Sequence, residues 1–164
     1  MNIVISDTTA LIILAKSDKL ELLSNLFKEV FIPLAVKDEL DFKDDIVKYR
    51  IDKFDKIRVR DIGDIKILNR IKKLNIDDRE IEAISLAIEL DLKLIIDERK
   101  GRIIAINQGL DVIGVLGILV ENYRLDYISF DEANYFFQLF KKNGLRVSEK
   151  LETLILEKLN DLKK

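Results

Sequence analysis

The sequence predicts an α/β fold in which a central, mainly parallel sheet is flanked by helices. Short runs rich in β-branched residues alternate with helical segments, an order typical of parallel strands joined by crossover helices. The 164 residues suffice for one domain with its own core, and no repeat, low-complexity tract or Pro/Gly/Ser-rich linker divides them. We therefore expect a single domain over residues 1–164.

The chain is expected to open with a strand and two helices. Residues 3–5 are Ile-Val-Ile, a short β-branched strand. Asp-Thr-Thr at residues 7–9 supplies helix-capping side chains, and an apolar helix is expected over residues 10–15. A second helix is expected near residues 19–27.

A second strand and helix follow, and then a charged stretch. Val-Phe-Ile at residues 30–32 predicts the strand, and Pro33 suits the first turn of a helix that runs through Leu40. Residues 44–75 are charged and mostly helical in pattern, with a short strand expected at residues 57–59.

The alternation is clearest in the next part of the chain. Residues 77–90 predict an amphipathic helix, and residues 92–96 form a continuous apolar run, typical of a strand buried on both faces. A helix over residues 102–107, a strand at residues 112–113 and a helix over residues 115–123 complete the pattern.

Two amphipathic helices are expected at the C-terminal end, over residues 131–142 and 148–162. We therefore divide the domain into an α/β core, about residues 1–128, and a helical extension, about residues 129–164. The apolar stripe of the last helix either covers the sheet or packs against a second subunit, and the pattern leaves both open.

The composition restricts the chemistry. The sequence contains no cysteine and no histidine, which excludes disulfides, thiolate nucleophiles, Ser-His-Asp triads and imidazole metal sites. Any catalysis must rest on carboxylates. The net charge of −2 argues against binding nucleic acid through bulk charge, so an RNA substrate would need a local basic patch.

The sequence offers no membrane span and no targeting segment. No run approaches the roughly 18 apolar residues of a membrane span, and the N-terminus lacks the pattern of a signal peptide. We therefore expect a cytoplasmic protein that does not contact a membrane.

Carboxylates follow two of the predicted strands. Asp7 comes after the first strand, and Asp97 and Glu98 come after the long apolar strand. Ligands of open α/β sheets bind beyond the carboxyl ends of the strands, so these acids are candidates for one shared site. The alternative is that Asp7 only caps the next helix and Asp97 only begins a turn.

The helix over residues 77–90 carries two glutamates that point in different directions. At about 100° per residue, Glu82 falls on the polar face with Ser85, whereas Glu80 falls on the apolar face with Ala83. A carboxylate that faces a core is costly unless it is paired or binds a metal, which makes Glu80 a candidate functional residue. The alternative is that Glu80 reaches solvent over the helix end and favours the helix dipole.

Several short motifs follow one another in a defined order. They are Ile-Ser-Asp-Thr-Thr-Ala-Leu-Ile at residues 5–12, Val-Phe-Ile-Pro at 30–33, Val-Lys-Asp-Glu-Leu at 36–40, Glu-Ile-Glu-Ala-Ile-Ser-Leu-Ala at 80–87, Leu-Ile-Ile-Asp-Glu-Arg-Lys-Gly-Arg at 94–102, Gly-Val-Leu-Gly at 114–117 and Asn-Gly-Leu-Arg-Val-Ser at 143–148. This order resembles the PIN-domain family, and in particular a VapC-like subgroup described as nucleic-acid-binding proteins. The resemblance spans almost the whole chain.

The resemblance implies a Rossmann-like PIN fold and an endonucleolytic ribonuclease that depends on Mg²⁺ or Mn²⁺, as in the toxin halves of VapBC toxin–antitoxin pairs. Matched position by position, the catalytic acids would be Asp7, Glu39, Glu80 and Asp97. The metal would be bound by Asp7, Glu80, Asp97 and Glu98. Glu39, an ordinary surface charge by itself, gains a role only through the resemblance.

Two positions depart from the family pattern. Arg79 stands where the family usually has glycine, and Asp97-Glu98 stands where it commonly has two aspartates. Adjacent residues at a strand end point to opposite sides, so the sequence does not decide which acid of that pair faces the metal.

Basic residues near the predicted site are candidates for substrate contact. Arg99, Lys100 and Arg102 would hold phosphates without reading bases, and Thr8 would hydrogen-bond a metal-bound water. For each of them the alternative is a solvated surface position or a helix cap. The expected partners are RNA, an antitoxin protein encoded elsewhere and a second copy of the chain in a homodimer.

Three other functions compete with the nuclease. The first is a catalytically inactive PIN-like module that binds RNA or protein. The second is a phosphoacceptor receiver domain, which requires paired acids after the first strand, where this chain has Asp7 followed by threonines. The third is a nucleotide-binding Rossmann enzyme, whose G-x-G-x-x-G and G-x-x-x-x-G-K-[ST] motifs are missing.

Overall fold

The computed structural model of the chain describes residues 2–43 and 45–163. Within these ranges the centre of the molecule is a sheet of five parallel strands in the order β3-β2-β1-β4-β5. The strands are β1 (Asn2–Ser6), β2 (Phe27–Ile32), β3 (Ile57–Val59), β4 (Leu94–Ile95) and β5 (Val112–Ile113). The predicted α/β fold with a parallel sheet is confirmed.

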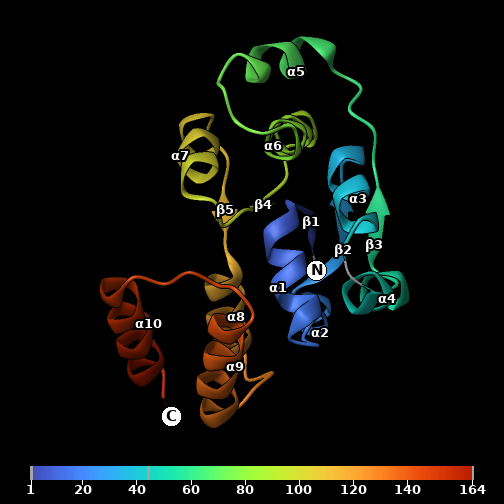
Figure 1. Cartoon of the computed structure of the whole chain (residues 1–164). Helices are drawn as coiled ribbons and strands as arrows, with labels where there is room; N and C mark the ends of the chain where they lie inside the picture. Colours follow the sequence, from blue (N-terminus) through green and yellow to red (C-terminus); the bar gives the residue numbers. More distant parts are fainter. Residues whose placement is uncertain (1, 44, 164) are drawn as a thin grey trace.

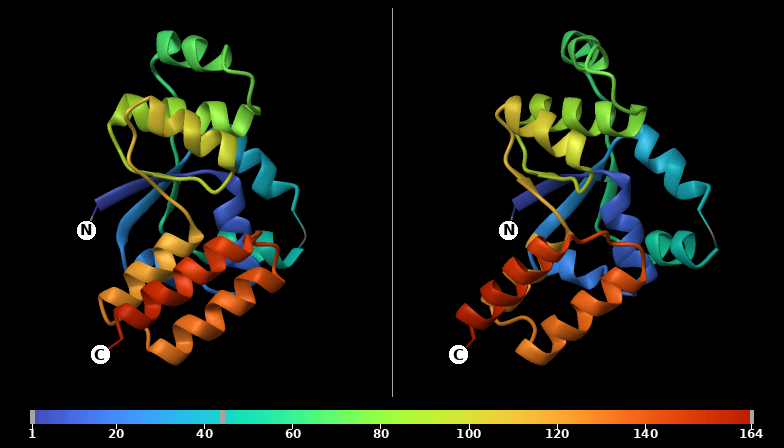
Figure 2. Two further views of the ribbon diagram at one scale, coloured as in Figure 1. Left: turned by 90° about the vertical axis from the view of Figure 1, so that its left-hand side faces the viewer. Right: turned by 60° about the vertical axis from the view of Figure 1, so that its left-hand side comes forward.

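Helices cover both faces of this sheet (Figure 1, Figure 2). Helices α5, α6 and α7 lie on one side, and α1, α2, α8, α9 and α10 lie on the other. The helices are α1 (Thr8–Lys16), α2 (Glu21–Ser24), α3 (Leu34–Asp41), α4 (Asp45–Lys53), α5 (Ile65–Lys72), α6 (Asp78–Leu90), α7 (Arg99–Asn107), α8 (Val115–Arg124), α9 (Phe130–Lys142) and α10 (Glu149–Asp161).

The two sides have separate hydrophobic cores, and adjacent strand residues contribute to different ones. Val4 packs in the core beneath α1 and α8, whereas Ile5 packs in the core beneath α6, and both are fully buried. Ile95 and Ile96 divide in the same way. Side chains alternate across a strand, so a strand that is covered on both faces must be apolar at successive positions.

Three predicted boundaries differ from the structure. The helix expected near residues 19–27 is only α2, because Phe27 already pairs with β1 as the first residue of β2. The strand expected over residues 92–96 is confined to β4, and α7 begins at Arg99, earlier than expected. The expected strand at residues 57–59 is present as β3.

The C-terminal helices share a core with the sheet. Phe136, Phe137 and Phe140 of α9 and Leu159 of α10 are buried in the same cluster as the apolar residues of α1 and α8. The single-domain organisation stays a prediction, which these shared contacts favour. No helix in the described ranges is long and apolar enough to cross a membrane.

The strand order places a crevice at one edge of the sheet. The chain runs from β1 outward to β2 and β3, and then returns to β4 and β5 on the other side of β1. Such a reversal opens a crevice beyond the carboxyl ends of the two central strands. β1 and β4 are paired in register, with Ser6 opposite Ile95, and the Asp7 amide donates to the Ile95 carbonyl at 2.9 Å. The acids that follow these two strands therefore lie at one place.

Candidate functional site

Asp7, directly after β1, is the most deeply placed acid of the site. Its side chain makes no capping hydrogen bond to α1, although its backbone occupies the N-cap position. The residue is 4% exposed, and its Oδ1 atom has no hydrogen-bond partner within the described part of the chain. The same is true of the Oγ1 atom of the adjacent Thr8. Burial raises the pKa of Asp7 to about 6, and the nearby negative charge of Asp77 adds to the effect.

Glu80 lies in the first turn of α6 and faces the interior, as its helical position predicts. It is 5% exposed, so it does not reach solvent over the helix end. Burial raises its pKa to about 7, and the charges of Asp77 and Asp7 raise it further. Space for this side chain is provided by Gly101, where a Cβ atom would lie 3.4 Å from the Glu80 carboxyl carbon and 2.7 Å from Ile96.

The predicted polar face of α6 is partly wrong. Ser85 was expected to face solvent, yet it is fully buried and its hydroxyl donates to the Ile81 carbonyl at 2.7 Å. Helix α5 packs against α6 on the side away from the sheet, so α6 is covered on more than one face.

Asp97 and Glu98 have different surroundings. Both Asp97 carboxylate oxygens accept from the Val115 amide at the start of α8, at 3.3 and 3.1 Å. Burial raises the pKa of Asp97, and the hydrogen bond from Val115 opposes that rise. A Cβ atom at Gly114 would lie 2.4 Å from Asp97 Oδ1, so glycine is needed for this contact. Glu98 is exposed and lines the same cavity as Asp7 and Glu80, whereas Asp97 does not.

Glu39, on α3, is held by two cations. Its Oε1 atom lies 2.9 Å from Lys43 Nζ and 3.0 Å from Arg79 Nη1, and the hydrogen bond from Lys43 lowers the pKa of Glu39. Arg79 also pairs with Asp77 at 3.2 Å. Its guanidinium group thereby brings positive charge close to Asp7 and Glu80 and partly opposes the rise that burial causes in both of their pKa values.

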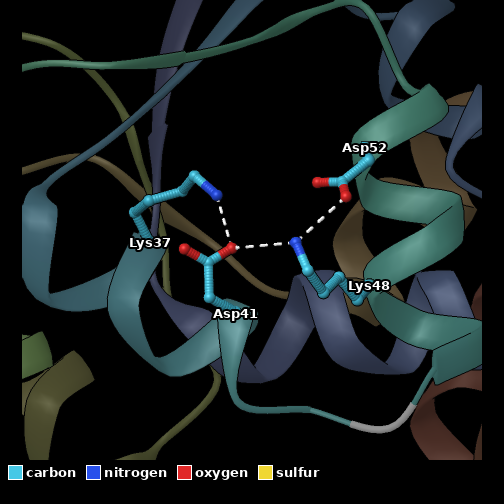
Figure 3. A network of polar contacts seen from close by, with 4 residues as sticks. All are labelled: Lys37, Asp41, Lys48 and Asp52. Atoms are coloured by element: carbon cyan, nitrogen blue, oxygen red, sulfur yellow. Dashed lines mark hydrogen bonds and ion pairs between the residues drawn. The ribbon is translucent and has the colours of Figure 1, made fainter.

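Helix α3 is tied to the neighbouring α4 by a network of charged side chains (Figure 3). Asp41 pairs with Lys37 in the same helix and with Lys48 of α4, and Lys48 also pairs with Asp52 at 3.1 Å. Exposed pairs of this kind contribute little to stability, but a network restricts how the helix carrying Glu39 is oriented.

The side chains around Asp7 and Glu80 enclose an acidic cavity of about 230 Å³. The lining residues are Asp7, Thr8, Thr9, Ile12, Glu39, Lys43, Asp77, Arg79, Glu80 and Glu98. Sequence reasoning named neither Asp77 nor Arg79 as a site residue. The signal for Asp77 was its position three residues before Glu80, where it caps α6 by accepting from the Glu80 amide at 3.0 Å.

The donor set fits a hard divalent cation. The cavity offers carboxylate oxygens and threonine hydroxyls, the ligands that Mg²⁺ and Mn²⁺ prefer. Burial disfavours the charged forms of Asp7 and Glu80, and one Asp7 oxygen has no hydrogen-bond partner in the described ranges, so a bound cation would stabilise both carboxylates. As the side chains stand, however, no three acids in the described ranges are grouped closely enough to hold a metal ion together.

The predicted substrate-contact residues lie outside the acidic cavity, except for Thr8. The Lys100 ammonium donates to the Asn75 carbonyl at 2.8 Å, and Arg102 Nη1 donates to the Ile96 carbonyl at 2.9 Å. Both cations are therefore engaged by the protein itself. Arg99 is exposed at the start of α7.

The fold has a counterpart among solved structures. VapBC2 from Rickettsia felis, in a crystal structure bound to a DNA fragment from their promoter, has a chain with a similar fold, with a TM-score of 0.51 and 18% identity over 68% of this chain and 98% of that one. A PilT N-terminus domain protein from the archaeon Sulfolobus solfataricus P2 gives a TM-score of 0.46 and 20% identity over 75% of this chain and 94% of that one. No curated protein matches the sequence. A family model described as PIN domain matches residues 3–161, nearly the whole length, and the chain therefore belongs to the PIN-domain family.

Proposed function

We propose that this protein is a divalent-metal-dependent ribonuclease whose acidic cavity holds the metal ion. The observation that carries the proposal is the Asp7 carboxylate, which is buried beside Glu80 with one oxygen unpartnered. A buried carboxylate in this state is costly, and a bound cation would remove the cost. The PIN-domain family and the resemblance to VapC proteins support the choice of RNA as the substrate.

Asp7 and Glu80 would hold the ion, with Glu98 at the rim of the cavity. A bound Mg²⁺ or Mn²⁺ would supply a water of lowered pKa and would offset negative charge on the phosphodiester. Glu39 would join the site if its pair with Arg79 opened, because Arg79 now occupies its Oε1 atom. Asp97 would act as a positioning residue, because both of its oxygens are engaged by the start of α8.

The experiment is cleavage of labelled single-stranded and structured RNA by purified protein with Mg²⁺, Mn²⁺ or a chelator. Asp7→Asn and Glu80→Gln should each lower the rate by about 100-fold or more, while both variants stay folded. Glu157→Gln is the matched control, because Glu157 is exposed on α10, away from the cavity, and its loss should leave the rate unchanged.

The second candidate is an inactive PIN-like module that binds RNA or protein. It is favoured by the absence of a group of three converging acids in the described ranges and by the ion pair between Arg79 and Glu39. Calorimetric titration with Mn²⁺ separates the two functions. A wild-type protein that binds RNA but neither binds Mn²⁺ nor cleaves would establish the binding module instead.

We further propose that the protein works with an antitoxin and forms a homodimer. The support for the antitoxin is the likeness of the fold to a chain of VapBC2, which is at the level of fold alone. Light scattering on the purified protein tests the dimer: a mass close to 19.0 kDa at micromolar concentration would exclude it.

A further inference from the structure

A second cavity adjoins the acidic one and is closed by the C-terminal part of the chain. It has a volume of about 340 Å³, and its lining residues are Thr9, Ile13, Asp97, Glu98, Gly144, Leu145 and Arg146. Thr9 and Glu98 line both cavities, so the two hollows lie next to each other on either side of these side chains. Residues 144–146, in the connection between α9 and α10, therefore form one wall of this second cavity.

This connection, residues 143–148, is held in place at its start by the end of α9. The Leu145 amide donates to the Phe140 carbonyl at 2.9 Å and the Gly144 amide to the Lys141 carbonyl at 3.3 Å, the hydrogen-bond pattern of a Schellman motif. Gly144 has a φ of +109°, which only glycine adopts readily. The conformation of this turn is therefore set by the hydrogen bonds within residues 140–145 and by the glycine at position 144.

The same segment is anchored to the rest of the molecule. The Asn143 amide group donates to the Ser17 hydroxyl at 3.0 Å, at the end of α1. Leu145 and Val147 pack against the core beneath α1 and α8, and the Ser148 hydroxyl caps α10 by accepting from the Leu151 amide at 3.1 Å. These contacts fix the backbone of the segment and so determine where its exposed side chains begin.

Arg146 is exposed and lies between Leu145 and Val147, whose side chains pack inward. Its guanidinium group makes no ion pair and no hydrogen bond with any residue of the described ranges, although Asp97 and Glu98 line the same cavity. Arg79 is engaged by Glu39 and Arg102 by the Ile96 carbonyl, and Arg99 is exposed but lines neither cavity. Arg146 therefore offers the cavity an unengaged fork of donors, whose geometry matches a phosphate or a carboxylate.

We propose that Arg146 binds a backbone phosphate of single-stranded RNA in the second cavity and thereby positions the strand across the acidic site. The inference rests on the proposed function for its substrate class. It explains how an acidic protein holds an anion beside a cluster of carboxylates: a cation carried by an anchored segment would hold the strand on one side of the acids. Such a contact adds affinity without reading bases.

The test measures RNA binding separately from cleavage. In an Asp7→Asn background, the affinity for a labelled single-stranded RNA is measured by fluorescence anisotropy over a range of salt concentrations. Adding Arg146→Gln should weaken binding about tenfold and lower the slope of log Kd against log salt by about 0.7, the value for one phosphate contact on a single strand. Arg146→Lys should keep the slope and lose part of the affinity, because it keeps the charge but not the fork.

Arg124→Gln is the matched control. Arg124 lies at the far end of α8 and pairs with Glu121 at the surface, so its loss removes the same charge away from both cavities. Its Kd should stay within about twofold of the parent. Equal affinities and equal salt slopes for Arg146→Gln and Arg124→Gln would overturn the inference.

Cleavage and metal binding distinguish this inference from the nuclease proposal. In the otherwise wild-type protein, Arg146→Gln should raise KM more than it lowers kcat and should leave the affinity for Mn²⁺ unchanged. A wild-type protein that does not cleave, but whose RNA binding depends on Arg146, would reject the nuclease and leave this inference standing. A cleaving protein with an unchanged KM in Arg146→Gln would reject this inference alone.

Discussion

Replacing the buried carboxylates by amides should make the metal-free protein more stable at alkaline pH. Asp7 is 4% and Glu80 is 5% exposed, and burial raises their pKa values from 3.8 to about 6 and from 4.5 to about 7. At about 1.4 kcal/mol for each pH unit by which the pKa is raised, ionising either group costs about 3 kcal/mol more in the folded than in the unfolded protein. The charge of Asp7 contributes to the raised pKa of Glu80, so their joint cost is not the sum.

The direction of the pH dependence follows from the raised pKa values. From about pH 4 to about pH 7 the folded protein retains protons that the unfolded chain has released, so the stability falls as the pH rises through this window. The stability that these retained protons contribute is complete at pH values below the pKa values in the unfolded chain. It is lost at pH values above the pKa values in the folded protein. Asn and Gln carry no charge and remove the dependence.

The assay is thermal unfolding of the wild type, Asp7→Asn and Glu80→Gln with a chelator at about pH 5 and about pH 8.5. At the higher pH each variant should gain about 2–3 kcal/mol, equivalent to a rise in Tm of about 5–10 °C for a chain of this size. At the lower pH the gain should be much smaller. Mn²⁺ at the higher pH should stabilise the wild type more than either variant.

The reasoning would be refuted if the variants and the wild type differed by the same Tm at both pH values. That result would mean that neither carboxylate is destabilised by its charge in the folded protein. Glu157→Gln, which removes an exposed carboxylate from α10, should show no difference from the wild type at either pH.

Three further changes test other parts of the structure. Arg79→Gln removes the cation that pairs with Glu39 at 3.0 Å, so Mn²⁺ should bind about tenfold more tightly. Calorimetric titration measures this affinity. Unchanged or weaker binding would show that Arg79 does not compete with the metal. Gly114→Ala places a Cβ atom 2.4 Å from Asp97 Oδ1, so it should displace that carboxylate from α8 and lower the cleavage rate. A cleavage rate equal to that of the wild type would contradict the positioning role of Asp97. Phe137→Ala, at a fully buried site of α9, should lower the free energy of unfolding by about 3–5 kcal/mol in urea, whereas a loss below about 1 kcal/mol would show that α9 is not part of the cooperative core.

Much of the fold was predictable from local patterns. Val4 and Ile5 are both apolar because β1 is covered on both faces, and this alone indicated a buried parallel strand. The same reasoning placed Asp7 at a strand end and Glu80 on the inward face of its helix, and the structure buries both. The alternation of strands and helices then required a crossover topology.

The hydrophobic pattern was less informative where a helix is covered by a second element on its polar face, because the sequence of the helix does not show that contact. Ser85 was expected to face solvent because it shares a helical face with Glu82, but α6 is also covered by α5. The start of β2 at Phe27 depends on its pairing with β1, which is a contact between distant residues. Boundaries set by pairing cannot be read from propensity alone.

The sequence by itself determined which chemistry is available and which elements carry it. The chain has no histidine or cysteine, so only carboxylates are available, and these follow predicted strands. Only the tertiary structure decided which charges meet. It pairs Arg79 with Glu39, directs Asp97 to the start of α8 while Glu98 lines the acidic cavity, and brings Arg146 to the adjoining one. Local periodicity records which side of an element is buried, whereas the distance between two charges on different elements is set by how those elements pack.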